Sequence, residues 1–284
     1  MTVAAPSVGV PLPHRPGRAA RTVRRIGFYA PAIAVFVGGI GLWELLAGSS
    51  EARSLILPPP SAIAAALVEN WSGGRWPLLE SAATTLYEAV GGLVIGTVVG
   101  IAVALAVSRW ATARDAVLPF AIAANAIPII AIAPIFNNWF GVLNPVSKMM
   151  IAALLVFFPV MINVTRGLTQ VDASAVELMR SYAATDWTVL RKVRIPNALP
   201  FFLTALKVAT TLSLIGAIVG EYFGGASGVL GRVVVQSASA LRFDVTWAAI
   251  LLAAIVGVAL YVGVTALERL LIPWHGSLRG DEVG

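Results

Sequence analysis

Apolar runs long enough to cross a lipid bilayer alternate with short polar segments along most of this chain. Hydrophobic residues make up 58% of the 284 residues and charged residues only 12%, whereas soluble domains carry about 25% charge. A run of about 20 apolar residues spans the hydrocarbon core when it forms a helix. Six such runs predict an all-α membrane protein with six transmembrane helices, which cover residues 26–48, 84–107, 117–139, 146–164, 201–223 and 245–267.

The basic residues orient these six helices. An even number of spans places both tails, residues 1–25 and 268–284, on one side of the membrane. With that side as the cytoplasm, fifteen of the twenty lysines and arginines lie inside, as the positive-inside rule requires. The five that lie outside are Arg53, Arg75, Lys148, Arg232 and Arg242. The first apolar run is too long for the core of a signal peptide, so we expect it to be retained as a helix.

The composition excludes several kinds of active site. The chain has no cysteine, which excludes disulfides, thiol catalysis and cysteine-based metal sites. Its two histidines lie in the polar tails, so we predict no metal site. No lysine follows a glycine, so the phosphate loop GxxxxGK[ST] is absent, and any ATP must be hydrolysed by another chain. The net charge of +6 sits in short flanks between apolar runs, which favours membrane lipid over nucleic acid as a partner.

Glycines at four-residue spacing mark two of the spans for close packing. Gly92, Gly96 and Gly100 fall on one face of the second span, and Gly216 and Gly220 on one face of the fifth. Small residues at this spacing let a neighbouring helix approach closely. We therefore predict that both spans pack tightly against other helices of the membrane domain.

Polar and helix-breaking residues within the apolar runs are candidates for a translocation path. Irregular backbone in a bilayer must face protein or a water-filled cavity, and an intramembrane carboxylate is costly enough to indicate a function. The candidates are Asn125, Pro128, Asn137, Thr211, Ser213 and Glu221. Simpler interpretations remain open: a kinked packing helix in the third span, hydroxyls bonded within the fifth, and an interfacial Glu221 in contact with water. Glu44 and Glu88 stand near predicted span ends, and we expect both at the interface.

One long polar segment, residues 165–200, separates the fourth and fifth spans. Its sequence SAVE predicts a capping box, with Ser174 as the N-cap and Glu177 bonding back to it. Glu177 is also free to bond the backbone of a partner. A helix over residues 175–182 should follow. A stiff polar loop between membrane spans is typical of a segment that docks a soluble partner.

A second short helix is predicted over residues 187–194, with Thr185 or Asp186 as its N-cap. We expect Pro196 and Pro200 to end this helix before the fifth span begins. Large aromatic side chains with flanking arginines are the residue types that carry interface energy. The residues expected to bend the loop or contact its partner are Glu177, Arg180, Tyr182, Ala183, Asp186, Trp187 and Arg191.

The segment VELMRSYAATDWTVLRKVRIPNALP resembles the EAA loop of bacterial ABC-importer permeases of the binding-protein-dependent type. That pattern begins Glu-Ala-Ala, has a glycine six residues after the glutamate, and ends in an Ile/Leu-x-Pro element. Glu177 occupies the glutamate position, Leu and Met replace the two alanines, Ala183 replaces the glycine, and Pro196 and Pro200 match the proline end. ILPPPSAI, AIPIIAIAPIFNNWFG and ALKVATTLSLIGAIVGEYFGG are similar to segments of the nitrate/sulfonate/taurine-type permeases, whose relatives include permeases associated with pyrimidine thiamine precursors and flavins.

The resemblance implies a type I ABC-importer permease fold with a cytoplasmic EAA-type coupling loop, in the bacterial inner membrane with both termini in the cytoplasm. It implies a homodimer of two permease copies around a pore, two cytoplasmic ATPase subunits and an extracytoplasmic solute-binding protein. This chain would bind no cofactor, since ATP and Mg²⁺ belong to the ATPase. The solute would be small: like a sulfonate, nitrate or taurine, or a pyrimidine-type or flavin-type vitamin precursor.

Two other classes of membrane protein compete with this interpretation. A stand-alone secondary transporter or channel predicts more spans or an internal inverted repeat, together with paired intramembrane charges. A membrane enzyme predicts a cluster of catalytic side chains on one face, which the sequence lacks. Six spans, few intramembrane charges and a stiff polar loop favour the permease, which is a transport subunit and not an enzyme.

Overall fold

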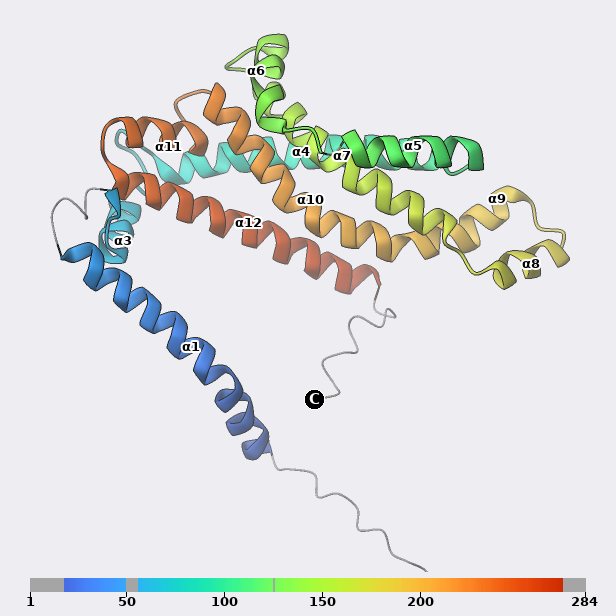
Figure 1. Cartoon of the computed structure of the whole chain (residues 1–284), viewed down its shortest axis with the longest axis horizontal. Helices are drawn as coiled ribbons and strands as arrows, with labels where there is room; N and C mark the ends of the chain where they lie inside the picture. Colours follow the sequence, from blue (N-terminus) through green and yellow to red (C-terminus); the bar gives the residue numbers. More distant parts are fainter. Residues whose placement is uncertain (1–17, 50–55, 125, 273–284) are drawn as a thin grey trace, which may run out of the picture. The chain divides into compact units, whose positions relative to one another are not determined.

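The computed structural model describes residues 18–49, 56–124 and 126–272. Its regular secondary structure in these residues is helical (Figure 1). The helices, in chain order, are α1 (Arg18–Gly48), α3 (Pro60–Glu69), α4 (Leu78–Val107), α5 (Ala111–Ala124), α6 (Ile129–Phe140), α7 (Pro145–Thr169), α8 (Ala173–Ser181), α9 (Asp186–Val189), the π-helical turn η1 (Leu190–Arg194), α10 (Ile195–Phe223), α11 (Leu230–Ser239) and α12 (Phe243–Leu271). Asn125 and most of both predicted tails lie outside the described residues.

The chain divides into two compact units, residues 1–61 and 62–284. The first unit contains α1, in which residues Ala30–Gly48 are long and apolar enough to cross a membrane. The helix begins at Arg18, so it extends into the basic segment that was predicted as a tail, residues 1–25. Arginine is a good helix former, and no proline or glycine interrupts residues 18–26.

The second unit is built around α7. Half of the most apolar stretch of α7 is buried, compared with 11% of the corresponding stretch of α12. α7 packs against α4 on one side and α10 on another, and Figure 1 shows these three helices running close together. α8 and α9 lie at one end of this bundle and α11 at the opposite end (Figure 1).

Glycines bring the backbones of α4 and α10 against α7. A β-carbon placed on Gly92 would lie 2.4 Å from the β-carbon of Ala152, and one on Gly96 would lie 2.5 Å from the carbonyl oxygen of Ala153. Gly100 and Gly220 also face α7, at the height of Val160 and Lys148 respectively. No larger residue fits at Gly92 or Gly96 unless the helices separate.

The expected third span is interrupted. α5 and α6 replace it, and neither is among the five described helices that are long and apolar enough to cross a membrane. The break falls before Pro128, which is the N-cap of α6. A proline disfavours helical backbone in the residue before it, whereas Pro119 and Pro134 lie inside α5 and α6 without ending them.

Candidate functional site

The outer arm of the 165–200 loop is α8. Asp172 is its N-cap: one carboxylate oxygen accepts the hydroxyl and the backbone N–H of Ser174, both at 2.9 Å. These two hydrogen bonds hold the pKa of Asp172 below its usual value, and the bond from the hydroxyl has the larger effect. The predicted N-cap, Ser174, is therefore wrong, because a carboxylate two residues earlier supplies a stronger acceptor. Glu177 lies exposed on α8.

α8 ends in a bend at Ala183. The backbone N–H of Ala183 donates to the carbonyl of Arg180 at 2.9 Å, and that of Ala184 donates to Met179 at 3.0 Å. These two bonds form a Schellman motif, which ends a helix with one left-handed residue. Ala183 is that residue, with a φ of 52°. The backbone therefore adopts the glycine conformation even though the side chain is alanine, at a cost of about 1–2 kcal/mol.

The inner arm of the loop consists of α9 and η1, and it is continuous with α10. Thr185 is the N-cap of α9, and its hydroxyl oxygen accepts the backbone N–H of Thr188 at 3.3 Å. The helix then runs without a break from Asp186 to Phe223. The predicted stop at Pro196 and Pro200 is wrong. Pro196 lies in the first turn of α10, directly after η1, and the wider π-helical turn accommodates a residue that has no N–H.

Asn197 closes the base of the loop, a role that the sequence did not reveal. Its side-chain amide donates to the carbonyl oxygens of Gly167 at 2.7 Å and Gln170 at 3.1 Å. A β-carbon on Gly167 would lie 2.6 Å from the α-carbon of Ala198. The end of α7 and the start of α10 are thus held in direct contact, so a force on α9 reaches both helices.

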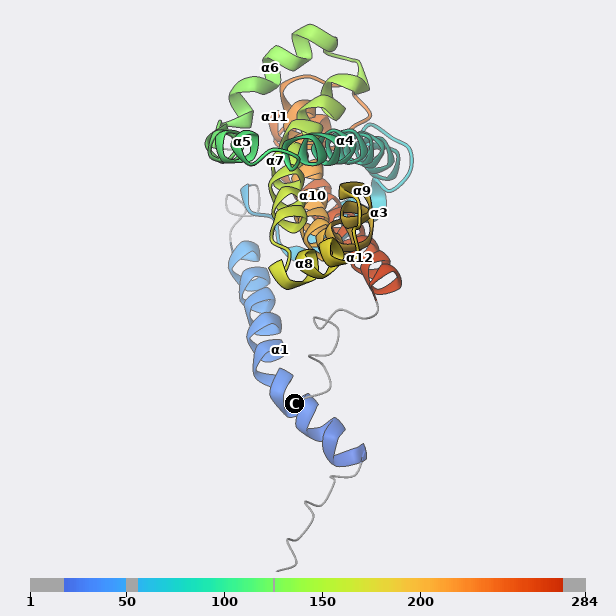
Figure 2. The same ribbon diagram turned by 90° about the vertical axis from the view of Figure 1, so that its right-hand side faces the viewer.

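The seven loop residues predicted to bend the chain or meet a partner are all exposed. Tyr182 is 76% exposed and Trp187 67%. Figure 2, which views the structure from the α8–α9 end, shows these two helices in front of α10. The structure places the seven residues on one protruding element.

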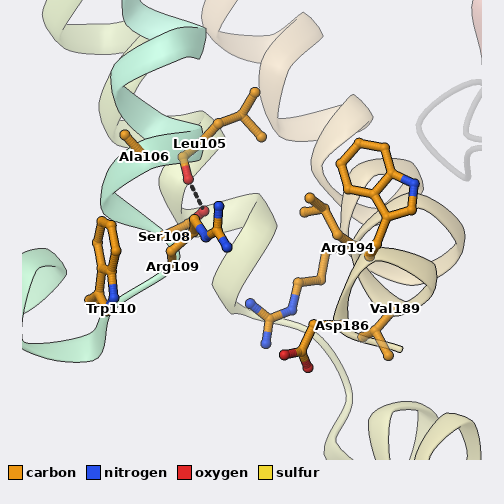
Figure 3. Close-up of a pocket in the computed structure, with 10 residues that line it drawn as sticks. Leu105, Ala106, Ser108, Arg109, Trp110, Asp186, Val189 and Arg194 are labelled. Atoms are coloured by element: carbon orange, nitrogen blue, oxygen red, sulfur yellow. Dashed lines mark hydrogen bonds between the residues drawn. The ribbon is translucent and has the colours of Figure 1, made fainter. Parts of the chain in front are cut away.

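A pocket adjoins the inner arm of the loop (Figure 3). It has a volume of about 660 Å³. One wall is the end of α4 with its connection to α5, and the other is α9 with η1. The lining residues are Leu105, Ala106, Ser108, Arg109, Trp110, Asp186, Trp187, Val189, Leu190 and Arg194. The pocket therefore joins two segments that are about 80 residues apart in the chain.

The described candidates for a translocation path differ in their burial and in their partners. Pro128 and Thr211 are exposed, and the buried hydroxyl of Ser213 donates to the carbonyl of Thr210 at 2.9 Å. The buried amide of Asn137 donates to the carbonyl of Gly220 at 3.0 Å. Asn125 lies outside the described residues. Asn137 thus bonds the residue that precedes Glu221, at the end of α10 next to α11.

Glu221 belongs to a buried polar cluster that ties α11 to the bundle. Its carboxylate accepts the backbone N–H of Gly231 at 2.7 Å, and the hydroxyl oxygen of Thr85 accepts that of Leu230 at 3.0 Å. Both N–H groups belong to the first turn of α11, whose donors have no partner within the helix. Glu221 and Thr85, both fully buried, thus fix α11 against α4 and α10. Glu221 is not an interfacial residue in contact with water.

Glu88 and Lys148 complete the cluster, and the sequence did not reveal that either is buried. Glu88 was expected at the interface and Lys148 outside the membrane, and within the protein they are 3% and 1% exposed. Glu88 interacts with the carboxyl group of Glu221, and both interact electrostatically with Lys148. The Lys148 ammonium donates to the carbonyl of Val142. α4 begins at Leu78, six residues before the predicted span, so Glu88 lies well inside the helix.

Comparison with known proteins identifies the type of chain. Residues 96–274 match the family model described as "Binding-protein-dependent transport system inner membrane component". A probable ABC transporter permease protein of Haemophilus influenzae is 30% identical over 223 residues, which cover 78% of this chain and 89% of that protein.

Two further relatives have names that include a substrate. The formylaminopyrimidine transport permease protein ThiX of Halalkalibacterium halodurans is 34% identical over 65% of this chain and 73% of its own length. The taurine transport system permease protein TauC of Escherichia coli is 28% identical over 84% of this chain and 87% of its own. These relatives are transport components rather than enzymes, and their substrates differ.

Proposed function

Because the chain belongs to the family of binding-protein-dependent transport system inner membrane components, we propose that it is the permease subunit of an ATP-driven importer. It moves a small solute across the inner membrane by alternating access, and a separate ATPase that binds ATP and Mg²⁺ supplies the energy. The relatives' names support a solute of the taurine or sulfonate type, or a pyrimidine-type or flavin-type vitamin precursor.

The observation that carries this proposal is the geometry of the 165–200 loop. Tyr182 and Trp187 project from it, and exposed aromatic side chains of this size are typical of binding hot spots. Trp187 lies on the helix that continues as α10 into the core. Movement of a docked ATPase would therefore reach the bundle through a stiff element, because Asn197 and the Schellman motif at Ala183 hold the loop together.

In this proposal two copies of the chain surround the path, and each loop binds one ATPase subunit in the cytoplasm. Both termini lie on the same side as the loops. An extracytoplasmic binding protein delivers the solute at the opposite end, where α11 packs on α4 and α10. Thr211 is exposed on α10, which leaves it accessible to a path between two copies. Glu221 and Asn137 hold the outer end of α10 in place and do not line the path.

The buried charges would also suit a secondary transporter, which was the competing interpretation. Family membership and the protruding loop favour the permease, since a transporter that works alone has no need of a docking element. In this permease the buried charges have a structural role: Lys148, Glu88 and Glu221 join α4, α7 and α10 at the end opposite the loop.

Co-purification of the partner ATPase with this chain tests the proposal. The double variant Tyr182→Ala/Trp187→Ala should lose the bound ATPase and solute uptake, while the permease still elutes as a folded species in detergent. Trp139→Ala/Tyr261→Ala removes two exposed aromatic residues from α6 and α12 and should retain the complex. An unchanged complex in the loop variant would remove these residues from the ATPase interface.

A further inference from the structure

The pocket beside α9 has features that neither ATPase docking nor solute passage requires. Part of its lining is apolar, with Leu105 and Ala106 at the end of α4 and Val189 and Leu190 on the opposite wall. The lining also contains Arg109, Arg194 and the two indoles of Trp110 and Trp187. Figure 3 shows the guanidinium groups of Arg109 and Arg194 directed toward the space between the two walls.

The two guanidinium groups are available for an anion. The salt bridges among the described residues involve neither Arg109 nor Arg194. Asp186 is the only acidic residue in the lining, so the pocket carries a net positive charge. A guanidinium presents a planar pair of N–H donors that suits phosphate oxygens. The guanidinium carbon of Arg109 also lies 5.9 Å from the centre of the Trp110 ring, which favours its position on that wall.

We infer that this pocket binds the phosphate of an anionic phospholipid, with the acyl chains against the apolar lining. The composition of the lining supports a lipid over a free phosphate ion, since four apolar side chains and two tryptophans accompany the arginines. Tryptophan concentrates at the headgroup level of membranes, and basic pockets between helices on the cytoplasmic side bind lipid headgroups. The inference rests on the proposed orientation, which puts this end of the bundle in the cytoplasm.

A lipid in this position would connect the α4–α5 turn to the element that carries the ATPase contacts. Trp187 and Asp186 belong both to the pocket lining and to the exposed inner arm of the loop. An anionic lipid would hold this arm against the end of α4. The lipid composition of the membrane would thereby influence how firmly the loop transmits movement to α10.

Lipid retention by the purified full-length permease tests the inference. The protein is delipidated, equilibrated with either phosphatidylglycerol or phosphatidylcholine of matched acyl chains, and analysed by native mass spectrometry. The wild-type chain should retain phosphatidylglycerol preferentially. Arg109→Gln/Arg194→Gln should weaken that binding by roughly fivefold for each arginine removed, because one basic residue near an anionic surface contributes about 1 kcal/mol. Arg114→Gln, whose arginine already pairs with Asp115, should bind as the wild type does.

Each other outcome contradicts the inference. Equal retention of both lipids by the wild type would show that the pocket does not select an anionic headgroup, and this comparison needs no variant to fold. Displacement of phosphatidylglycerol by an equal concentration of inorganic phosphate would assign the pocket to a soluble anion. Undiminished binding in the double arginine variant would place the lipid elsewhere. The experiment leaves Tyr182 and Trp187 unchanged, so its failure is separate from a failure of ATPase docking.

Discussion

The α-carbon of Ala152 lies 2.6 Å from the position that a β-carbon on Gly216 would occupy. From the other side, a β-carbon on Gly92 would come within 2.4 Å of the β-carbon of the same alanine. At Ala152, α7 therefore packs between α4 and α10 so closely that neither Gly92 nor Gly216 has space for a β-carbon. The three helices that form the core meet at this point.

Replacing Gly216 with alanine should destabilise the protein by about 1–3 kcal/mol, the usual cost of forcing extra atoms into a close-packed interior. The backbone of α7 would have to move, because the contacted atom is an α-carbon and not a flexible side-chain end. Thermal unfolding in detergent measures the effect. Gly263→Ala is the control, since nothing lies within 4 Å of a β-carbon there, and it should be neutral or slightly stabilising. Equal melting temperatures for both variants would contradict the close contact.

Ala183→Gly should stabilise the 165–200 loop by about 1 kcal/mol. Glycine adopts a φ of 52° without the clash that an L side chain suffers, and the exposed methyl group of Ala183 contributes no buried surface. Amide hydrogen exchange of α8 should slow in this variant. Ala184→Gly is the matched control, because the φ of Ala184 is not positive, and its exchange should accelerate. Faster exchange in Ala183→Gly would contradict the strain assigned to this bend.

The N-cap of α8 should respond to acid. The pKa of Asp172 is lowered in the folded loop by the Ser174 hydroxyl and N–H, so the carboxylate stabilises α8 at neutral pH. This contribution is lost as the pH falls through the folded pKa, below the ordinary value of about 3.9. Protection of the α8 amides should therefore persist from pH 8 to pH 5 and decrease only below about pH 4.

Two variants separate the charge of Asp172 from its capping role. Asp172→Asn keeps an oxygen acceptor at the N-cap and should retain protection at both ends of the pH range. Asp172→Ala should lose protection at every pH. If Asp172→Asn remained as sensitive to acid as the wild type, another group would be responsible for the titration.

Hydropathy predicted the five long apolar helices, although not the break in the expected third span. Glycine spacing predicted that α4 and α10 pack closely, although not that α7 is their common neighbour. Both patterns can be read within a single segment. The spacing of Gly92, Gly96 and Gly216 indicates close helix packing even when the neighbouring helix is unknown. The two-armed form of the 165–200 loop followed in the same way from local capping and turn residues.

Other features depend on tertiary contacts or on small shifts of a helix end. The predicted N-cap of α8 was Ser174, whereas the structure has Asp172. Both residue types are good N-caps, and only the folded backbone selects one of them. Pro196 did not end a helix, because the wider π-helical turn before it accommodates the proline ring and its missing N–H. Glu88 and Lys148 could not be paired from sequence, as they lie 60 residues apart and gain partners only where α4, α7 and α10 meet.

Lys148 should be essential for stability because it is the only buried cation among the described residues. Lys148→Met would leave the carboxyl groups of Glu88 and Glu221 without their positive neighbour, and breaking a buried charge pair in this way costs about 3–5 kcal/mol. The folded fraction that survives heating in detergent should fall sharply. Lys207→Met serves as the control, since Lys207 pairs with Glu268 at 2.6 Å but its side chain is 22% exposed, and its loss should be smaller.

Removing one carboxyl group together with the cation should restore much of the stability. Glu88→Gln/Lys148→Met takes both the lysine and one of its two carboxyl neighbours out of the buried cluster, and replacing both members of a buried pair is often close to neutral. The double variant should therefore unfold at a higher temperature than Lys148→Met alone, although each substitution lowers stability by itself. If the two effects simply added, Glu88 and Lys148 would not be coupled, and the lysine would matter only through its bond to the carbonyl of Val142.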